Sequence, residues 1–427
     1  MSLDLSTVNP HYLERAIDLS ESYEVCASED IYDAKGMKLL AKGTALAPGM
    51  HDRLIRHRLL KPLETSLSVA EGVSIDLVLE VARQLLDEMK PLRACRAQMS
   101  AGQSPLDVPA KIGLNNSMTT LLTMSYRTDG QRHFRHTVLV GLIATILAMR
   151  GGLPPDGVLS IAHAGLLHDI GEMYLNPAYL TSSAHLKPDE WKHVVVHPMV
   201  GQMVITEMTS YPPAVARAVG EHHERHDGSG YPRRIAHEQI SREGSIVAAA
   251  ETLGGIFMRR DNQLHCACVA MKIIPGEYAS EVVSNISSIV QSMPDVLATE
   301  AISSFSELAP HLQMLQQKLA EVLAQCDAIK GSPLFSKPAV QAVLLRVTDR
   351  IQVIQRSLVS SGVGACLLEP HQDATHPEIL LELEVVSREL AWRLRELARD
   401  VALHLPKDDD DVGVLFTGLI SALDQLQ

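Results

Sequence analysis

The composition of this 427-residue chain indicates a helical protein and limits what it binds. Hydrophobic residues make up 46% of the sequence and aromatic residues only 4%, so the core must consist mainly of Leu, Val, Ile, Ala and Met, which points to helices. The formal charge of −13 argues against a protein that binds polymeric nucleic acid through its phosphates, because such proteins carry a basic face. We expect a mainly α fold of two or three domains.

The cysteines and the apolar segments predict a cytoplasmic protein without a membrane segment. The six cysteines form no Cys-x-x-Cys pair, as is typical of reduced thiols in the cytosol. The N-terminus lacks the basic and apolar regions of a secretory signal. The longest apolar run, near residues 138–149, is too short to span a bilayer.

The first 70 residues are expected to form a small α+β module. The segments Tyr23–Tyr32 and Met37–Ala41 flank a turn-like cluster at 33–36, and a helix is predicted from Pro48 to Leu60. We find no titratable constellation in this module, so a regulatory or scaffolding role is the preferred interpretation. A helical linker is expected at residues 71–112, because apolar residues follow at helical spacing.

The middle of the chain places metal-binding side chains next to apolar segments. His136 precedes an apolar run, the pair His168 and Asp169 ends another, and His197 precedes Pro198. A buried histidine bonded to a carbonyl could explain each of them singly. Together they favour a metal site, since neutral imidazoles are among the commonest metal ligands. Asp169 could bridge two ions while His168 binds one.

The segment from His222 to Pro232 adds two adjacent histidines and a glycine-rich loop. Neighbouring residues on a helix do not share a face, so His222 and His223 suit two ions, or two edges of one cluster, better than a packed core. Gly228 and Gly230 allow the backbone to approach a ligand closely. An ordinary surface turn with solvated histidines is the alternative explanation of this pair by itself.

Glu251 lies inside an apolar stretch, residues 246–258. An ionised carboxylate there is penalised unless it is paired or coordinated, so a cation is its natural partner. An exposed helix edge or a bond to one arginine is the alternative. Mixed imidazole and carboxylate ligands suit divalent iron or manganese. Two such ions about 3.5–4 Å apart promote phosphoester hydrolysis.

The order of these elements resembles the HD-GYP family, a branch of the HD phosphohydrolase superfamily. The matching elements are His136, His168-Asp169-Ile170-Gly171, His197-Pro198, His222-His223-Glu224 and Asp227-Gly228-Ser229-Gly230-Tyr231-Pro232. The resemblance covers roughly residues 117–275. It implies an HD-type helical bundle, placed at residues 113–300, that hydrolyses the bacterial second messenger cyclic di-GMP at two divalent metal ions with a bridging hydroxide.

Carried over position by position, the resemblance assigns roles to individual residues. The implied metal ligands are His136, His168, Asp169, His197, His222, His223 and, by its position, Glu251. Asp169 is the bridging carboxylate and the implied catalytic residue. The implied substrate-binding residues are Gly230, Tyr231, Pro232 and Arg260. Arginine suits that role because its planar donors match phosphate.

Several positions depart from the family pattern. Glu172 stands where the family usually has a lysine, and two unit charges about 4 Å apart interact by a few kcal/mol, so Glu172 would repel an anionic substrate unless protonated or paired. Glu251 and Gly254 stand where the family has two aspartates. Some members hold a third ion with a glutamate at the position of Arg132, so a two-metal centre is expected. Of the arginines between residues 217 and 260, we expect all but Arg260 to form rim salt bridges.

Two functions follow from this pattern. The retained ligands favour a cyclic di-GMP phosphodiesterase. The departures at Glu172, Glu251 and Gly254 favour a catalytically impaired relative that binds metal or nucleotide and signals through protein–protein interaction.

The last third, residues 301–427, predicts an additional helical bundle. Apolar residues recur at helical spacing over Leu312–Cys326, Leu344–Leu358 and Ile379–Val401. We see no catalytic residues here. These helices could form a homodimer or bind a signalling partner.

Overall fold

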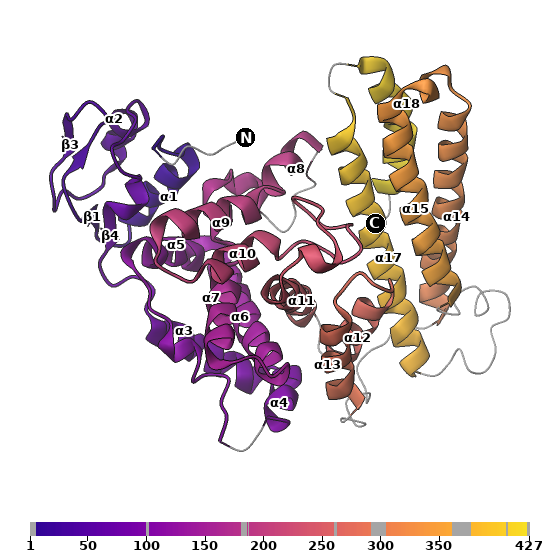
Figure 1. Ribbon diagram of the computed structural model, residues 1–427, viewed down its shortest axis with the longest axis horizontal. Coiled ribbons are helices and arrows are strands. Elements are labelled where there is room, and N and C mark those ends of the chain that lie inside the picture. Colours follow the sequence, from indigo (N-terminus) through magenta and orange to yellow (C-terminus); the bar gives the residue numbers. More distant parts are fainter. Residues whose placement is uncertain are drawn as a thin grey trace. The chain divides into compact units, whose positions relative to one another are not determined.

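The computed structural model describes residues 6–99, 102–180, 186, 188–259, 263–291, 305–360, 377–406 and 409–424. The described chain is mainly helical, with two small sheets near its N-terminus (Figure 1). This confirms the expected fold class. Among the described residues, none of the helices combines the length and the apolar character needed to cross a lipid bilayer.

The chain divides into two compact units. The first contains Met1–His185, His193–Arg260 and Gly276–Ile289, and the second contains Leu186–Lys192, Asp261–Pro275 and Val290–Gln427. The domain boundaries inferred from the sequence, at residues 70, 112 and 300, stay predictions.

The short strands of the N-terminal module form two antiparallel pairs. The helix α1 (Pro10–Ser20) begins at Asn9, whose side chain accepts hydrogen bonds from two backbone N–H groups of its first turn. Strand β1 (Val25–Ala27) pairs antiparallel with β4 (Leu67–Val69), and β2 (Ile31–Tyr32) pairs antiparallel with β3 (Lys38–Leu40).

The helix predicted from Pro48 to Leu60 is shorter in the structure. It consists of a 3-10 turn, η1 (Pro48–Met50), and α2 (His51–Ile55). The chain then becomes extended, because Leu59 bridges Asp33 and the N–H of Leu60 donates to the carbonyl of Tyr32 at 3.0 Å. Pairing with a strand therefore ends the helix.

A long series of helices forms the body that follows. They are α3 (Ile75–Glu88), α4 (Lys90–Ala97), α5 (Asn116–Arg127), α6 (Arg132–Arg150), α7 (Pro155–Leu167), α9 (His197–Met208), α10 (Pro213–Glu221), α11 (Arg242–Phe257) and α13 (Ser280–Gln291). Most of α8 (Pro188–Val194) and all of α12 (Gln263–Lys272) belong to the second unit. Helix α6 packs against α7 and α11, and α10 packs against α9 and α11 (Figure 1). A short 3-10 helix, η5 (Ile170–Tyr174), follows α7.

Two glycines bring α6 and α7 close together. A Cβ atom added at Gly165 of α7 would lie 2.8 Å from the Cα of Gly141 in α6, a distance that real Cβ atoms do not adopt. The close contact holds the neighbouring residues of both helices near one another. His136 lies on α6, and His168 lies just after α7.

The second unit is a helical bundle with an apolar interior. Its long helices are α14 (Phe305–Lys330), α15 (Pro338–Ser360), α17 (Pro377–His404) and α18 (Asp410–Asp424). The three predicted apolar stripes bury their side chains in one cluster, to which α18 adds Phe416 and Leu419. The predicted C-terminal bundle is therefore confirmed within the described residues.

A buried carboxyl connects the N-terminal module to η5. Glu64 is 4% exposed, and burial raises its pKa to about 7. Its charge adds to burial in raising the pKa of Tyr12 in α1 and of Tyr174 in η5. The two tyrosine rings stack with their centroids 5.5 Å apart. The module thus packs against the segment that directly follows Asp169.

This carboxyl predicts a stability that depends on pH. A pKa raised from 4.5 to about 7 in the folded state means that stability is complete below pH 4.5 and decreases as the pH rises through 7, by about 3 kcal/mol. We expect Glu64→Gln to unfold at a higher temperature than the wild type at pH 8, and to differ little at pH 4.5. The exposed Glu24→Gln serves as the control in thermal unfolding at both pH values. A Glu64→Gln effect of equal size at both would contradict the assignment.

Candidate metal centre

Helix ends bring distant histidines to one place. His168 directly follows α7, His197 is the first residue of α9, and His222 directly follows α10. Gly171 allows η5 to pass the start of α9, because a Cβ atom there would lie 2.1 Å from the carbonyl oxygen of His197. The chain therefore converges at this point without room for a side chain at position 171.

Backbone carbonyls fix the orientation of three of these rings. The Nδ1 atoms of His168, His197 and His222 lie 2.8, 2.8 and 2.6 Å from backbone carbonyl oxygens three residues earlier. A carbonyl only accepts hydrogen bonds, so each Nδ1 carries the hydrogen and donates it. In the neutral ring the Nε2 lone pair is then free, which is the arrangement of a metal-ligating histidine.

One group of potential ligands combines Asp169 with three histidines. Ligand atoms of Asp169, His197, His222 and His223 all lie within 4.8 Å of one another. The Oδ1 atom of Asp169 is 3.4 Å from the Nε2 of His197 and 3.5 Å from the Nε2 of His222. This geometry could hold one cation.

A second group shares the same aspartate. It contains His136, His168, Asp169 and Glu251, again with ligand atoms within 4.8 Å of one another. The Nε2 of His168 is 2.9 Å from Oδ2 of Asp169 and 3.0 Å from Oε2 of Glu251. The Nε2 of His136 is 2.9 Å from the same Glu251 oxygen. Each oxygen of Asp169 therefore faces a different group.

The Nε2 atoms of the cluster face one another and the carboxylates, so protons or cations must lie between these atoms. The Nε2 atoms of His197 and His222 are 3.1 Å apart, and both rings carry a hydrogen on Nδ1. The buried Nε2 of His168 makes no well-aligned hydrogen bond among the described residues, although carboxylate oxygens of Asp169 and Glu251 lie 2.9 and 3.0 Å away. Facing lone pairs in the interior are unfavourable unless a proton or a cation lies between them, and a divalent cation would meet this need for several of these atoms at once.

The pKa values divide the histidines of the cluster into two sets. Burial lowers the pKa of His222 to about 4 and that of His223 well below its usual value, so both rings are neutral at pH 7. Burial also opposes the charged forms of His136, His168 and His197, but the neighbouring carboxylates outweigh it and raise all three pKa values. Burial opposes the charged forms of Asp169 and Glu251, but neighbouring histidines outweigh it and hold both carboxyl pKa values well below their usual range. These carboxylates stay ionised and attract positive charge.

The glycine-rich loop packs directly on one of the histidines. The ring of Tyr231 stacks on that of His223 with centroids 4.5 Å apart. The backbone N–H of Tyr231 donates to the backbone carbonyl of His223 at 3.0 Å. Gly230 lies so close to the same backbone that a Cβ atom would be 2.4 Å from that carbonyl oxygen. Pro232 follows Tyr231 in this loop. Arg260 lies outside the described residues.

A third group was missed by the sequence analysis. His133, Asp169 and Glu172 also place ligand atoms within 4.8 Å of one another. A signal was present, since His133 precedes His136 by three residues and therefore shares its face of α6. Burial raises the pKa of Glu172 to about 8, and burial lowers that of His133 to about 4.

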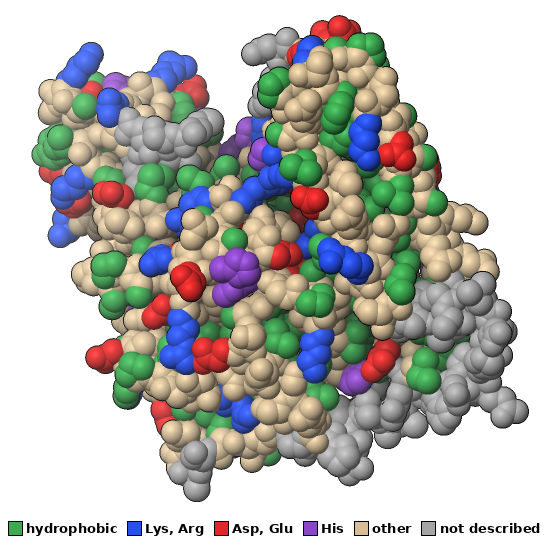
Figure 2. Space-filling view, turned by 45° about the vertical axis from the view of Figure 1, so that its right-hand side comes forward, with side chains coloured by type: hydrophobic (Ala, Val, Ile, Leu, Met, Phe, Trp, Pro, Cys, Tyr) green, Lys and Arg blue, Asp and Glu red, His purple; other side chains and the backbone are tan. Residues whose placement is uncertain are grey.

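Three of the arginines between residues 217 and 260, namely Arg217, Arg233 and Arg242, pair with carboxylates as expected. Arg217 donates to Glu221 at 2.8 Å, and a guanidinium nitrogen of Arg233 lies 3.7 Å from the same carboxylate. On the face drawn in Figure 2, basic and acidic side chains are interspersed. Arg225 departs from the expectation. It is buried and lies over the ring of Tyr278, 5.1 Å from the centroid.

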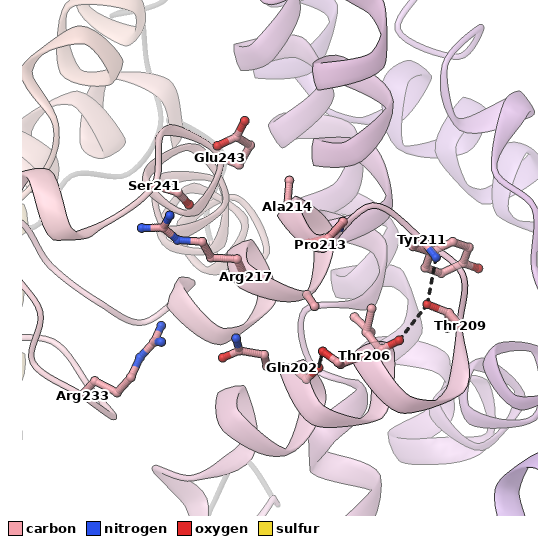
Figure 3. A pocket seen from close by; sticks show the side chains of 12 residues that line it. Gln202, Thr206, Thr209, Tyr211, Pro213, Ala214, Arg217, Arg233, Ser241 and Glu243 are labelled. Atoms are coloured by element: carbon pink, nitrogen blue, oxygen red, sulfur yellow. Dashed lines mark hydrogen bonds between the residues drawn. The ribbon is translucent and has the colours of Figure 1, made fainter.

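A cavity of about 630 Å³ lies beside α9 and α10. Figure 3 shows Arg217 and Arg233 on one side of it and Thr209 and Tyr211 on the other. The three groups of potential metal ligands do not line this cavity. Its arginines are held by buried Glu221, so we do not assign it to substrate.

Comparisons with known proteins find related sequences for the region that contains these residues. A family model described as HD domain matches residues 118–260. A cyclic di-GMP phosphodiesterase of Thermotoga maritima is 30% identical over 183 residues, which cover 42% of this chain and 50% of the relative. A 3'3'-cGAMP-specific phosphodiesterase of Vibrio cholerae is 24% identical over 190 residues, 43% of this chain and 41% of the relative. The chain thus spans half or less of the length of these curated relatives.

Among solved structures, the HDG"Y"P protein Bd1817 of Bdellovibrio bacteriovorus matches 62% of this chain and 95% of its own chain, at 15% identity and a TM-score of 0.33.

The matched region and the buried histidine and aspartate cluster define an HD-domain protein. More narrowly, the chain has distant homology to the HD-GYP cyclic di-GMP phosphodiesterases. The resemblance inferred from its motifs is therefore confirmed. The assignment of individual ligands stays a proposal.

A metal site of this kind predicts stabilisation by divalent ions. At 100 times its dissociation constant, an ion that binds only the folded state stabilises it by about 2.7 kcal/mol, or roughly 5–10 °C in the unfolding midpoint. We expect Mn²⁺ to raise the midpoint of the wild type and of the exposed variant Glu207→Gln. Asp169→Asn should lose most of the increase, because both groups share this carboxylate. An equal increase in Asp169→Asn would argue against the site.

Proposed function

We propose that this protein is a metal-dependent phosphodiesterase that opens cyclic di-GMP at two divalent ions, iron or manganese. The single observation that supports it best is the position of Asp169, whose two oxygens face two separate groups of imidazole and carboxylate ligands. Nitrogen and oxygen ligands of this kind suit divalent iron and manganese. The pair of ions is the arrangement expected for phosphoester hydrolysis.

In this proposal, different residues of the chain bind different ions. Bound ions would supply a Lewis acid for the phosphate oxygens and a nucleophile made from water at neutral pH. Asp169 would hold both ions at a fixed separation. His197, His222 and His223 would bind one of them, and the ligands from α6, α7 and α11 would bind the other.

The substrate assignment follows the relatives and the loop. The two relatives described above act on cyclic di-GMP and on 3'3'-cGAMP, which share a cyclic phosphodiester backbone. In this proposal Gly230, Tyr231 and Pro232 contact the substrate next to His223, and Arg260 binds its phosphate. A partner of the C-terminal helices, either a second copy or a signalling protein, belongs to the same proposal.

The test is hydrolysis of cyclic di-GMP by protein prepared anaerobically with Mn²⁺ or Fe²⁺. We expect linear dinucleotide or GMP as the product, detected by chromatography. Asp169→Asn should reduce the rate by more than roughly 100-fold, because even the outer partners of metal ligands are worth 10–100-fold. Glu207→Gln, at an exposed position on α9, should retain the wild-type rate.

The same experiment separates the enzyme from a non-catalytic relative. Protein that carries two ions per chain and binds cyclic di-GMP without any product would contradict the phosphodiesterase. It would then support the catalytically impaired alternative that the departures at Glu172 and Glu251 suggest.

A further inference from the structure

Glu172 and His133 come from different elements and meet beside Asp169. The Nε2 of His133 lies 3.6 Å from Oε2 of Glu172, and the two side chains are only 17% and 16% exposed. Together with an oxygen of Asp169, their ligand atoms lie within 4.8 Å of one another. This group shares Asp169 with the two groups of the proposed metal centre, while its other two members belong to neither.

Local backbone geometry places the side chains of Glu172 and His133 beside Asp169. Glu172 follows Asp169 by three residues in η5, and its N–H donates to the carbonyl of Asp169 at 2.9 Å. Side chains three residues apart on a 3-10 helix lie above one another, so Glu172 and Asp169 share one side. His133 and His136 are likewise three residues apart on α6 and share one face. Both elements therefore extend the ligand cluster in one direction.

Three carboxyl groups lie around this buried region, those of Glu172, Asp169 and Glu251. Asp169 and Glu251 face several histidines, whereas the ion-pair contact of Glu172 within 4 Å, among the described residues, is with the single ring of His133. A buried carboxylate needs a charged or coordinating partner, and a divalent cation would supply one for Glu172. Asp169 can serve a further ion, since a carboxylate offers about four lone-pair positions.

We propose that His133, Glu172 and Asp169 bind a third divalent cation beside the two ions of the proposed centre. The inference rests on the proposed function, because it uses the same bridging aspartate. These residues differ from the position at which some HD-GYP members place a third-ion glutamate, which is Arg132 in this chain. One imidazole and two carboxylates suit a manganese, iron or magnesium ion. The three protein ligands leave coordination positions that the chain does not fill.

A third cation would change the electrostatic effect of Glu172 on an anionic substrate. From the sequence alone, a glutamate in place of the family lysine predicts repulsion of an anionic substrate. With a divalent ion bound, the glutamate instead holds positive charge where the family has a fixed lysine charge. The substitution then keeps the sign of the local charge.

The test counts metal ions in the full-length protein. Wild type, Glu172→Gln, His133→Gln and the exposed control Glu207→Gln are equilibrated anaerobically with Mn²⁺, and free metal is removed. Bound manganese is measured by mass spectrometry, and folding is checked by thermal unfolding. We expect three ions per chain in the wild type and in Glu207→Gln, and two in each of the other variants.

The outcomes separate this inference from the proposed function. Two ions in the wild type, unchanged by Glu172→Gln and His133→Gln, would overturn the third ion and leave the dinuclear centre intact. Fewer than two ions in the wild type would overturn both. His133→Gln decides the question if Glu172→Gln fails to fold, because it removes a ligand from a different element.

Discussion

The carboxylate of Asp169 is the constraint on which the rest of the site depends. It is 8% exposed, and a buried negative charge is stable only with close compensation. The compensation comes from rings delivered by the ends of α7, α9 and α10, with Nδ1–H groups tied to backbone carbonyls. The helix ends, the bare backbone at Gly171 and the Nε2 atoms turned toward Asp169 thus all serve to compensate this one buried charge.

Much of the candidate site could be predicted because its histidines and carboxylates lie in short, recognisable motifs. The sequence identified the residues that the structure brings together around Asp169, including Glu251 within its apolar stretch. It did not find His133, although this residue shares the α6 face of His136. It described Glu172 as repelling an anionic substrate unless protonated or paired, and it did not place this side chain beside His133. A 3-10 turn after Asp169, rather than a continued helix, decides which way Glu172 points, and the motif alone does not specify that turn.

The fold was predictable where one local pattern decides it. The apolar side chains that recur at helical spacing in the last third of the chain are buried in one cluster, as that spacing predicts. The helix predicted up to Leu60 failed because the backbone near Leu59 pairs with Asp33, far away in sequence. Burial of Arg225 against Tyr278 depends in the same way on a distant partner. Long-range contacts of this kind override local propensity.

Anomalous X-ray scattering from crystals grown with Mn²⁺ would test the central claim most directly. The account predicts a manganese peak on each side of Asp169, each at about 2.0–2.2 Å from one of its oxygens. One peak should contact the Nε2 atoms of His197 and His222, and the other should contact His168 and Glu251. Peaks that avoid Asp169, or a saturated crystal with no peak in this cluster, would contradict it.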